Sequence, residues 1–325
     1  MAKKRGCLGC SFPILIGILI LVLVLFFIGF ASGPLGKSLV GNIGLPDWLT
    51  VPQPEPKLPA ETVFDLFGFP VANTVFSAWI TIAVLVVFSY MATRRMKIIP
   101  GRFQMVFEAV LGYLYNFCQR VAGEKNGRRF FPVVATIFLF VAANAWLGLI
   151  PGYGSIIITT HEGEAVHLLR PVNTDINMPL ALALASFVFV EFFGFKSLGI
   201  RYLSKFINVG PLFRSFALMF TGKARAGLSG LITGFINVFV GMLEALSELV
   251  RIVSFTFRLF GNMTAGEILL LIATFLVPYL FALPFYGLEL LVGFVQALIF
   301  SGLTLVFLTV AVSAHGEETH SEESA

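Results

Sequence analysis

The chain has 325 residues, of which 57% are hydrophobic and 12% charged, and its mean hydropathy is +0.90. These values exclude an ordinary water-soluble domain. The net charge of +4 does not indicate nucleic-acid binding, because the cations stand in short segments between apolar runs. We therefore predict an all-α polytopic membrane protein.

Six stretches are apolar and long enough to be membrane elements. They cover residues 12–32, 72–93, 130–150, 178–195, 226–277 and 279–314. Of the 22 lysines and arginines, 17 lie in residues 3–5, 94–129 and 196–225, whereas the intervening loops hold only Lys37, Lys57 and Arg170. Loops rich in lysine and arginine face the cytoplasm, so both termini are predicted on that side.

The first apolar stretch has two interpretations. It fits either a membrane anchor or a cleaved signal peptide, because the basic residues Lys3–Arg5 precede the apolar run and small residues follow it at 31–33. We expect an N-terminal span or signal anchor over 1–33, an external Pro/Gly-rich linker over 34–60, a membrane core over 61–315 and an acidic cytoplasmic tail over 316–325. Cys7 and Cys10 lack companion ligands nearby, so no metal site is expected there.

Residues 103–121 carry apolar side chains at three- and four-residue spacing. This spacing predicts an amphipathic helix at the membrane interface, although an ordinary surface helix in a cytoplasmic loop would show the same pattern.

The stretch 226–277 is too long for one upright span. Its 52 residues would reach roughly 78 Å as a helix, whereas the hydrocarbon core is about 30 Å thick. It therefore either breaks, near Gly241 or Gly261, or forms one long and steeply tilted helix.

Ionisable residues inside the last two stretches are the strongest functional signal. An arginine at bilayer depth costs about 2.5–3.5 kcal/mol on insertion scales, so Arg258 requires a functional explanation. At about 100° per residue, Arg258 shares a helix face with four polar residues, whereas Glu267 projects from the opposite side. The four are Glu244, Arg251, Ser254 and Asn262.

Glu289 and Gln296 form a second polar stripe, because they are seven residues apart on the last element. If the last two elements form a hairpin that turns near residues 278–284, Glu267 and Glu289 lie eleven residues to either side of Pro278. The two carboxylates then meet at similar depth. Burial and like-charge repulsion disfavour ionisation of such a pair, which makes it able to pass protons. Arg258 does not release its proton, so its role is electrostatic.

Structural roles stay open for several of these residues. Glu244, Glu248 and Arg251 also fit an internal ion-pair cluster near the cytoplasmic surface. Asn262 and Gln296 also fit interhelical hydrogen bonds.

The string Ser-Phe-Thr-Phe-Arg-Leu-Phe-Gly-Asn-Met-Thr-Ala-Gly-Glu at 254–267 resembles the signature of subunit a of the F-type ATP synthase membrane sector. Other matching strings follow in family order within about residues 60–315. They are Ile-Pro-Gly-Arg-Phe-Gln at 99–104, Asn144 before Leu-Ile-Pro at 149–151, Thr-Asp-Ile-Asn at 174–177 and Gln-Ala-Leu-Ile-Phe at 296–300. Ile252 departs from the family, which commonly has proline there, and the family varies between histidine and glutamate at the position of Glu289.

The resemblance implies a non-catalytic stator subunit with no cofactor, and the distribution of lysines and arginines makes a bacterial plasma membrane the expected location. Its last two helices would lie tilted in the bilayer against a ring of c subunits, and b subunits of the peripheral stalk would be further partners. Protons would enter from outside past Glu289, Glu267, Gln296 and Asn262, and would leave toward the cytoplasm past Ser254, Arg251, Glu248 and Glu244. Arg258 would face the ring carboxylate and block a direct leak.

Two other interpretations are weighed against this one. A stand-alone proton or cation transporter would use Arg258 in alternating access, but we find no internal repeat of the 254–267 pattern. A membrane scaffold would use its polar residues only to hold helices together. The sequence has no GxxxxGK[ST] phosphate loop, so ATP chemistry is expected on other subunits.

Overall fold

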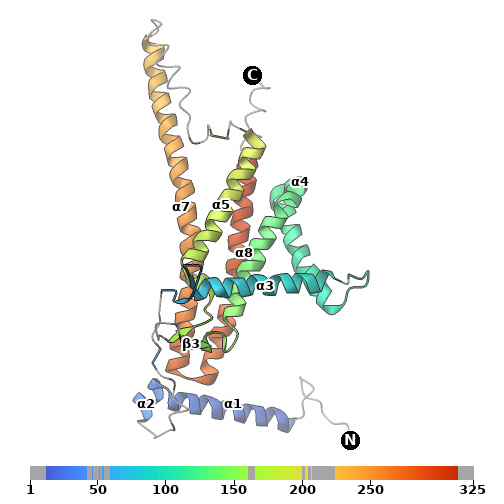
Figure 1. Cartoon of the computed structure of the whole chain (residues 1–325), viewed down its shortest axis with the longest axis vertical. Helices are drawn as coiled ribbons and strands as arrows, with labels where there is room; N and C mark the ends of the chain where they lie inside the picture. Colours follow the sequence, from blue (N-terminus) through green and yellow to red (C-terminus); the bar gives the residue numbers. More distant parts are fainter. Residues whose placement is uncertain are drawn as a thin grey trace. The chain divides into compact units, whose positions relative to one another are not determined.

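The computed structural model describes residues 12–41, 46, 51, 53–54, 59–94, 96–159, 165–199, 202–203, 206 and 224–313. Cys7, Cys10 and the acidic tail at 316–325 lie outside this part of the chain. The described residues contain six helices that are long and apolar enough to cross a membrane, as predicted (Figure 1). They are α1 (Phe12–Ser32), α3 (Asn73–Thr93), α4 (Arg102–Gly148), α5 (Asn177–Leu198), α7 (Ala224–Leu276) and α8 (Leu283–Ser313).

Shorter elements connect these helices. They are α2 (Pro34–Val40), β1 (Thr62–Leu66), β2 (Phe69–Ala72), η2 (Tyr153–Ser155), β3 (Ile157–Thr159), β4 (Ala165–His167), η3 (Val172–Thr174) and η5 (Tyr279–Ala282). The strands form two antiparallel pairs, β1 with β2 and β3 with β4. Helix α2 lies in the predicted linker, which is therefore partly helical. Pro34 suits the start of this helix because proline lacks the backbone N–H that the first helical turn leaves unpaired.

Helix α4 changes direction at Gly123, whose φ of 77° and ψ of 166° are not helical. Glycine adopts a positive φ without steric cost. The chain folds back there. This reversal brings the rings of Tyr115 and Phe131, on either side of Gly123, to 5.3 Å from each other. Residues 102–122 therefore form an arm distinct from the span, as predicted for 103–121. Phe103 and Val106 are exposed on this arm, which is consistent with a membrane-interface helix.

Helix α7 is continuous over 53 residues, about 80 Å at 1.5 Å per residue. The alternative in which this stretch breaks near Gly241 or Gly261 is therefore wrong. Glycine does not have to interrupt a helix in lipid, where intrahelical hydrogen bonds are the main way to satisfy the backbone. The tilt that such a length requires stays a prediction.

The chain forms two compact units, which are described separately. The first unit contains residues 1–78, 144–174 and 261–295, and the second contains residues 79–143, 175–260 and 296–325.

In the first unit, the end of α7 and the start of α8 form a hairpin that turns at residues 277–282, close to the predicted 278–284. Helix α1 runs across the end of this hairpin (Figure 1). A Cβ atom added at Gly29 would lie 2.2 Å from the Pro278 carbonyl oxygen, and one added at Gly33 would lie 2.2 Å from that of Leu276. Glycine at both positions therefore lets α1 contact the backbone of the turn.

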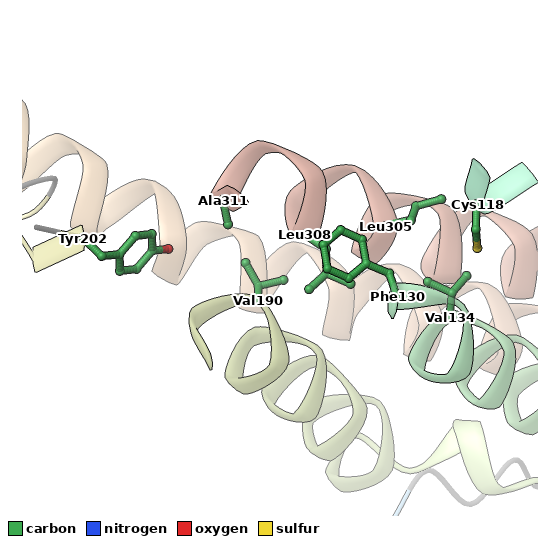
Figure 2. Packing of buried hydrophobic residues seen from close by; sticks show 8 residues of the cluster. All are labelled: Cys118, Phe130, Val134, Val190, Tyr202, Leu305, Leu308 and Ala311. Atoms are coloured by element: carbon green, nitrogen blue, oxygen red, sulfur yellow. The ribbon is translucent and has the colours of Figure 1, made fainter. Parts of the chain in front are cut away.

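The second unit has a core where α4, α5 and α8 meet (Figure 2). Phe130 and Val134 of α4 pack there with Val190 of α5 and with Leu305 and Leu308 of α8. Between α5 and α8, the hydroxyl groups of Ser186 and Thr304 form a buried hydrogen bond of 2.8 Å. Close packing and such bonds hold helices together in lipid, where the hydrophobic effect does not drive helices toward each other.

Candidate functional site

A cavity of about 370 Å³ lies in the first unit, lined by residues from the end of α4, from η2 and η3, and from the α7–α8 hairpin. Glu267 of α7 and Glu289 of α8 both line it. The spacing about Pro278 predicts this meeting. The hairpin thus presents two carboxylates to one cavity.

Glu289 is held tightly against α7. It is 8% exposed, and a Cβ atom added at Gly266 would lie 2.1 Å from its Oε2 atom. Only glycine at 266 leaves room for the carboxylate, which rests on the helix backbone next to Glu267. In the described part of the chain, no cation lies within ion-pairing distance of Glu289.

Glu267 has a cationic partner that the sequence analysis missed. The Nη2 atom of Arg170 lies 3.6 Å from Oε2 of Glu267. Arg170 is 8% exposed, its Nη1 donates a 2.9 Å hydrogen bond to the Pro59 carbonyl, and its backbone N–H donates to Ser77 Oγ at 3.1 Å. By its sequence position, Arg170 is only one of the three cations in the intervening loops. The available signal was its position between apolar Leu168–Leu169 and Pro171, which is unusual for a solvated charge.

Two buried amides also line the cavity. Asn144 and Asn173 are each 2% exposed, and neither their amide nitrogen nor their amide oxygen has a hydrogen-bond partner in the described protein. Buried polar groups are nearly always paired, so these amides indicate a polar occupant of the cavity. Water satisfies both donors and acceptors, and the volume accommodates roughly ten molecules. Asn144 belongs to the strings that carry the family resemblance, whereas Asn173 was not singled out.

Tyr153 of η2 adds a hydroxyl group to the same cavity. Burial raises the pKa of Tyr153 above its ordinary value of 10, and a hydrogen bond with Ser77 acts in the opposite direction. The side chain is therefore neutral at physiological pH and able to donate or accept a hydrogen bond.

The second unit contains Arg258, which is partly buried. Its Nη2 atom lies 3.5 Å from Ser254 Oγ, a long hydrogen bond, and its Cζ atom lies 5.8 Å from the centre of the Phe255 ring. These contacts match the predicted helix face for Ser254. No carboxylate in the described part of the second unit pairs with Arg258. The charge is thus held by weak contacts and is available to another anion.

Arg258 lies where a buried face of α7 meets an exposed apolar one. Leu259 and Phe257 project about 100° to either side of it, and they are 0% and 57% exposed respectively. Val250 and Val253, which are also exposed, continue the apolar face. An uncovered apolar face of this kind fits lipid or another membrane protein.

Glu248 and Arg251, which stand six and three residues before Ser254, form a close ion pair. Their shortest N–O distance is 2.7 Å, and the Arg251 Cζ atom lies 3.7 Å from the centre of the Phe307 ring. These contacts fit the internal ion-pair cluster that the sequence left open. Glu244, one turn earlier on α7, is partly buried.

The remaining predicted site residues differ in exposure. Asn262, in the first unit, is exposed, and Gln296, in the second, is 2% exposed. The first unit therefore brings Glu267 and Glu289 together. The second unit contains five predicted residues that follow one another along α7, namely Glu244, Glu248, Arg251, Ser254 and Arg258.

Comparisons with known proteins identify the family. Residues 75–309 match the family model described as ATP synthase A chain. ATP synthase subunit a 3 of Pelobacter propionicus is 32% identical over 249 residues, which cover 77% of this chain and 90% of that protein. ATP synthase subunit a of Moorella thermoacetica is 28% identical over 254 residues, covering 78% and 96% respectively. The chain therefore belongs to the ATP synthase subunit a family.

Proposed function

We propose that the chain is the stator subunit of the membrane sector of a bacterial F-type ATP synthase, and that it carries protons to and from a rotating ring. Its family and its six apolar helices support a multi-pass protein of the bacterial plasma membrane and a role in proton transport for ATP synthesis. A stand-alone transporter is not favoured, because the similar proteins are named as ATP synthase subunits.

The cavity of the first unit is the outer half-channel in this proposal. The observation that carries it is the meeting of Glu267 and Glu289 in one cavity with two unpaired buried amides. Carboxylates bind and release protons, and amide-bound water connects them to the aqueous side. Asn262 and Gln296 are proposed to continue this path toward the ring.

The inner half-channel follows α7 past Ser254, Arg251, Glu248 and Glu244 toward the cytoplasm. Arg258 lies one turn after Ser254 on α7, and no carboxylate in the described part of the second unit pairs with its charge. There it attracts the ionised carboxylate of a ring subunit and repels protons that would cross directly. Each charge that crosses 100 mV releases about 2.3 kcal/mol, which is useful only if the path is coupled to rotation.

The proposed partners are c subunits, which would pack on the exposed apolar face of α7 beside Arg258, and b subunits of the peripheral stalk. The chain itself is proposed to carry out no catalytic chemistry on ATP. Lipid covers the remaining apolar surface.

The test measures ATP-driven proton pumping by the intact complex in vesicles, with Glu289→Gln and Glu267→Gln compared with Glu124→Gln. Glu124 is an exposed carboxylate on α4 and serves as the control. We expect at least a roughly tenfold loss for each cavity variant and wild-type pumping for the control. Normal pumping by Glu289→Gln would contradict the proposed outer half-channel.

A further inference from the structure

The two carboxylates of the cavity have different surroundings. Glu267 lies 3.6 Å from the guanidinium group of Arg170, whereas Glu289 rests against the backbone at Gly266. The other titratable side chains among the described residues that line the cavity are Tyr153 and Tyr286. Arg170 is therefore the one fixed charge in this part of the first unit that distinguishes the two glutamates.

Arg170 is held in place from outside the hairpin. Its guanidinium group donates to the carbonyl of Pro59, and its backbone N–H donates to Ser77 at the start of α3. The adjoining strand β4 is fixed as well, because Asn73 Nδ2 donates a 3.2 Å hydrogen bond to the His167 carbonyl. A buried arginine with several partners keeps its position, so its charge acts on Glu267 at a constant distance.

We propose that Arg170 is a positioning residue that divides the work of the two carboxylates. It pairs with Glu267, and it leaves Glu289 as the group that takes up and releases the transported proton. The inference rests on the proposed outer half-channel. An opposite charge within about 4–6 Å favours the ionised form of a carboxyl group.

This assignment predicts an unusual relation between variants. Removing Arg170 leaves Glu267 free to compete for protons. Removing the charge of Glu267 leaves Arg170 buried without its carboxylate partner, which is costly. Each single change is therefore harmful. Removing both charges leaves Glu289 as the only charged group of the three, so the double variant works better than either single variant.

The experiment uses the whole complex in vesicles and measures ATP synthesis at a series of pH values on the outer side. We compare Arg170→Gln, Glu267→Gln, the double variant and Arg170→Lys, after confirming that each assembles with its ring. Lys37→Gln is the matched control, since it removes an exposed cation of the same unit. We expect each single neutral variant to lose about tenfold, and the double variant to regain at least half of that loss on a logarithmic scale.

The pH dependence separates a charge effect from a loss of structure. Arg170→Gln should change the outer-pH profile, whereas Arg170→Lys should keep the wild-type profile even at a lower rate. A double variant no better than the worse single one, or an unshifted profile, would overturn the role of Arg170. Normal synthesis by Glu289→Gln would instead overturn the outer half-channel itself, so the two failures can be distinguished.

A second inference comes from helix α1, which precedes the part matched by the family model. Gly29 and Gly33 contact the backbone carbonyls of Pro278 and Leu276, and Ser32 between them is buried and hydrogen-bonded to the Gly29 carbonyl. Residues 31 and 32 are helical and Ser32 is 2% exposed, so the small residues at the end of α1 belong to the packed contact with the turn. We infer that α1 stays in the mature chain and braces the turn of the α7–α8 hairpin.

The test measures the intact mass of the subunit from purified complex and the hydrogen exchange of residues 277–282. We expect the mass to include α1. In Gly29→Val and Gly33→Val, exchange at the turn should increase about tenfold, because a side chain at either position overlaps backbone. Gly17→Val is the matched control, since no atom lies within 4 Å of a Cβ at Gly17. A mature subunit without α1, or equal exchange in all variants, would overturn this inference.

Discussion

Substitution of Gly266 by alanine isolates the position of one carboxylate. A Cβ atom at 266 would lie between 2.1 and 2.2 Å from all three carboxyl atoms of Glu289. An ordinary contact is about 3.4 Å or more, so the carboxylate must move by roughly 1.3 Å. The end of a glutamate side chain can rotate into the adjacent cavity, so the fold should survive. Alanine also favours a helix over glycine by about 1 kcal/mol, which excludes helix loss as the cause of a defect.

A displacement of about 1 Å at a reacting group can cost up to roughly a hundredfold in rate. We therefore expect Gly266→Ala to assemble normally and to lose between ten- and a hundredfold in ATP-driven proton pumping, measured by fluorescence quenching in vesicles. Gly287→Ala, on the same hairpin, is the control, because no atom lies within 4 Å of a Cβ there. Adding Glu289→Asp to Gly266→Ala shortens the side chain by one methylene, about 1.5 Å, and should restore part of the activity. Wild-type pumping by Gly266→Ala would refute the reasoning that the site of Glu289 is sterically fixed.

Two further predictions concern the buried polar groups. Replacing Asn144 or Asn173 with leucine removes the hydrogen-bond partners of water in the cavity. Proton flux through the complex should then fall about tenfold while assembly is retained. Unchanged flux would show that the two amides do not belong to the proton path. Arg251→Gln leaves Glu248 buried without its cation and should destabilise the subunit by about 3–5 kcal/mol in thermal denaturation, whereas the double change Arg251→Gln with Glu248→Gln should be much less harmful. A double variant as unstable as the single one would contradict a structural ion pair.

Hydropathy and helical spacing predict much of this fold. The six apolar helices follow from length and composition, because a spanning helix must satisfy its backbone internally and cover itself with apolar side chains. The meeting of Glu267 and Glu289 follows from their equal distance to Pro278. These are features of single helices and of one short connection, where distance along the chain determines distance in space.

The partners of the two carboxylates depend on contacts that are distant in the sequence. Arg170 reaches Glu267 only because its loop packs on the hairpin, and nothing in the sequence near 170 specifies that contact. The contact between Glu289 and Gly266 is equally hard to predict from the sequence, because it depends on the absence of a side chain at 266. The choice between a broken and a continuous helix at 226–277 also required the structure, because glycines occur in both.

The central claim is that Arg258 couples proton movement to rotation, and replacing it with alanine tests this most directly. The complex is purified with its ring, reconstituted into vesicles, and measured for ATP-driven pumping and for passive proton leak. We predict normal assembly, loss of pumping and an increased leak, because no fixed positive charge would then separate the two half-channels. Normal pumping by this variant would contradict the account, and failure to assemble would favour a scaffold instead.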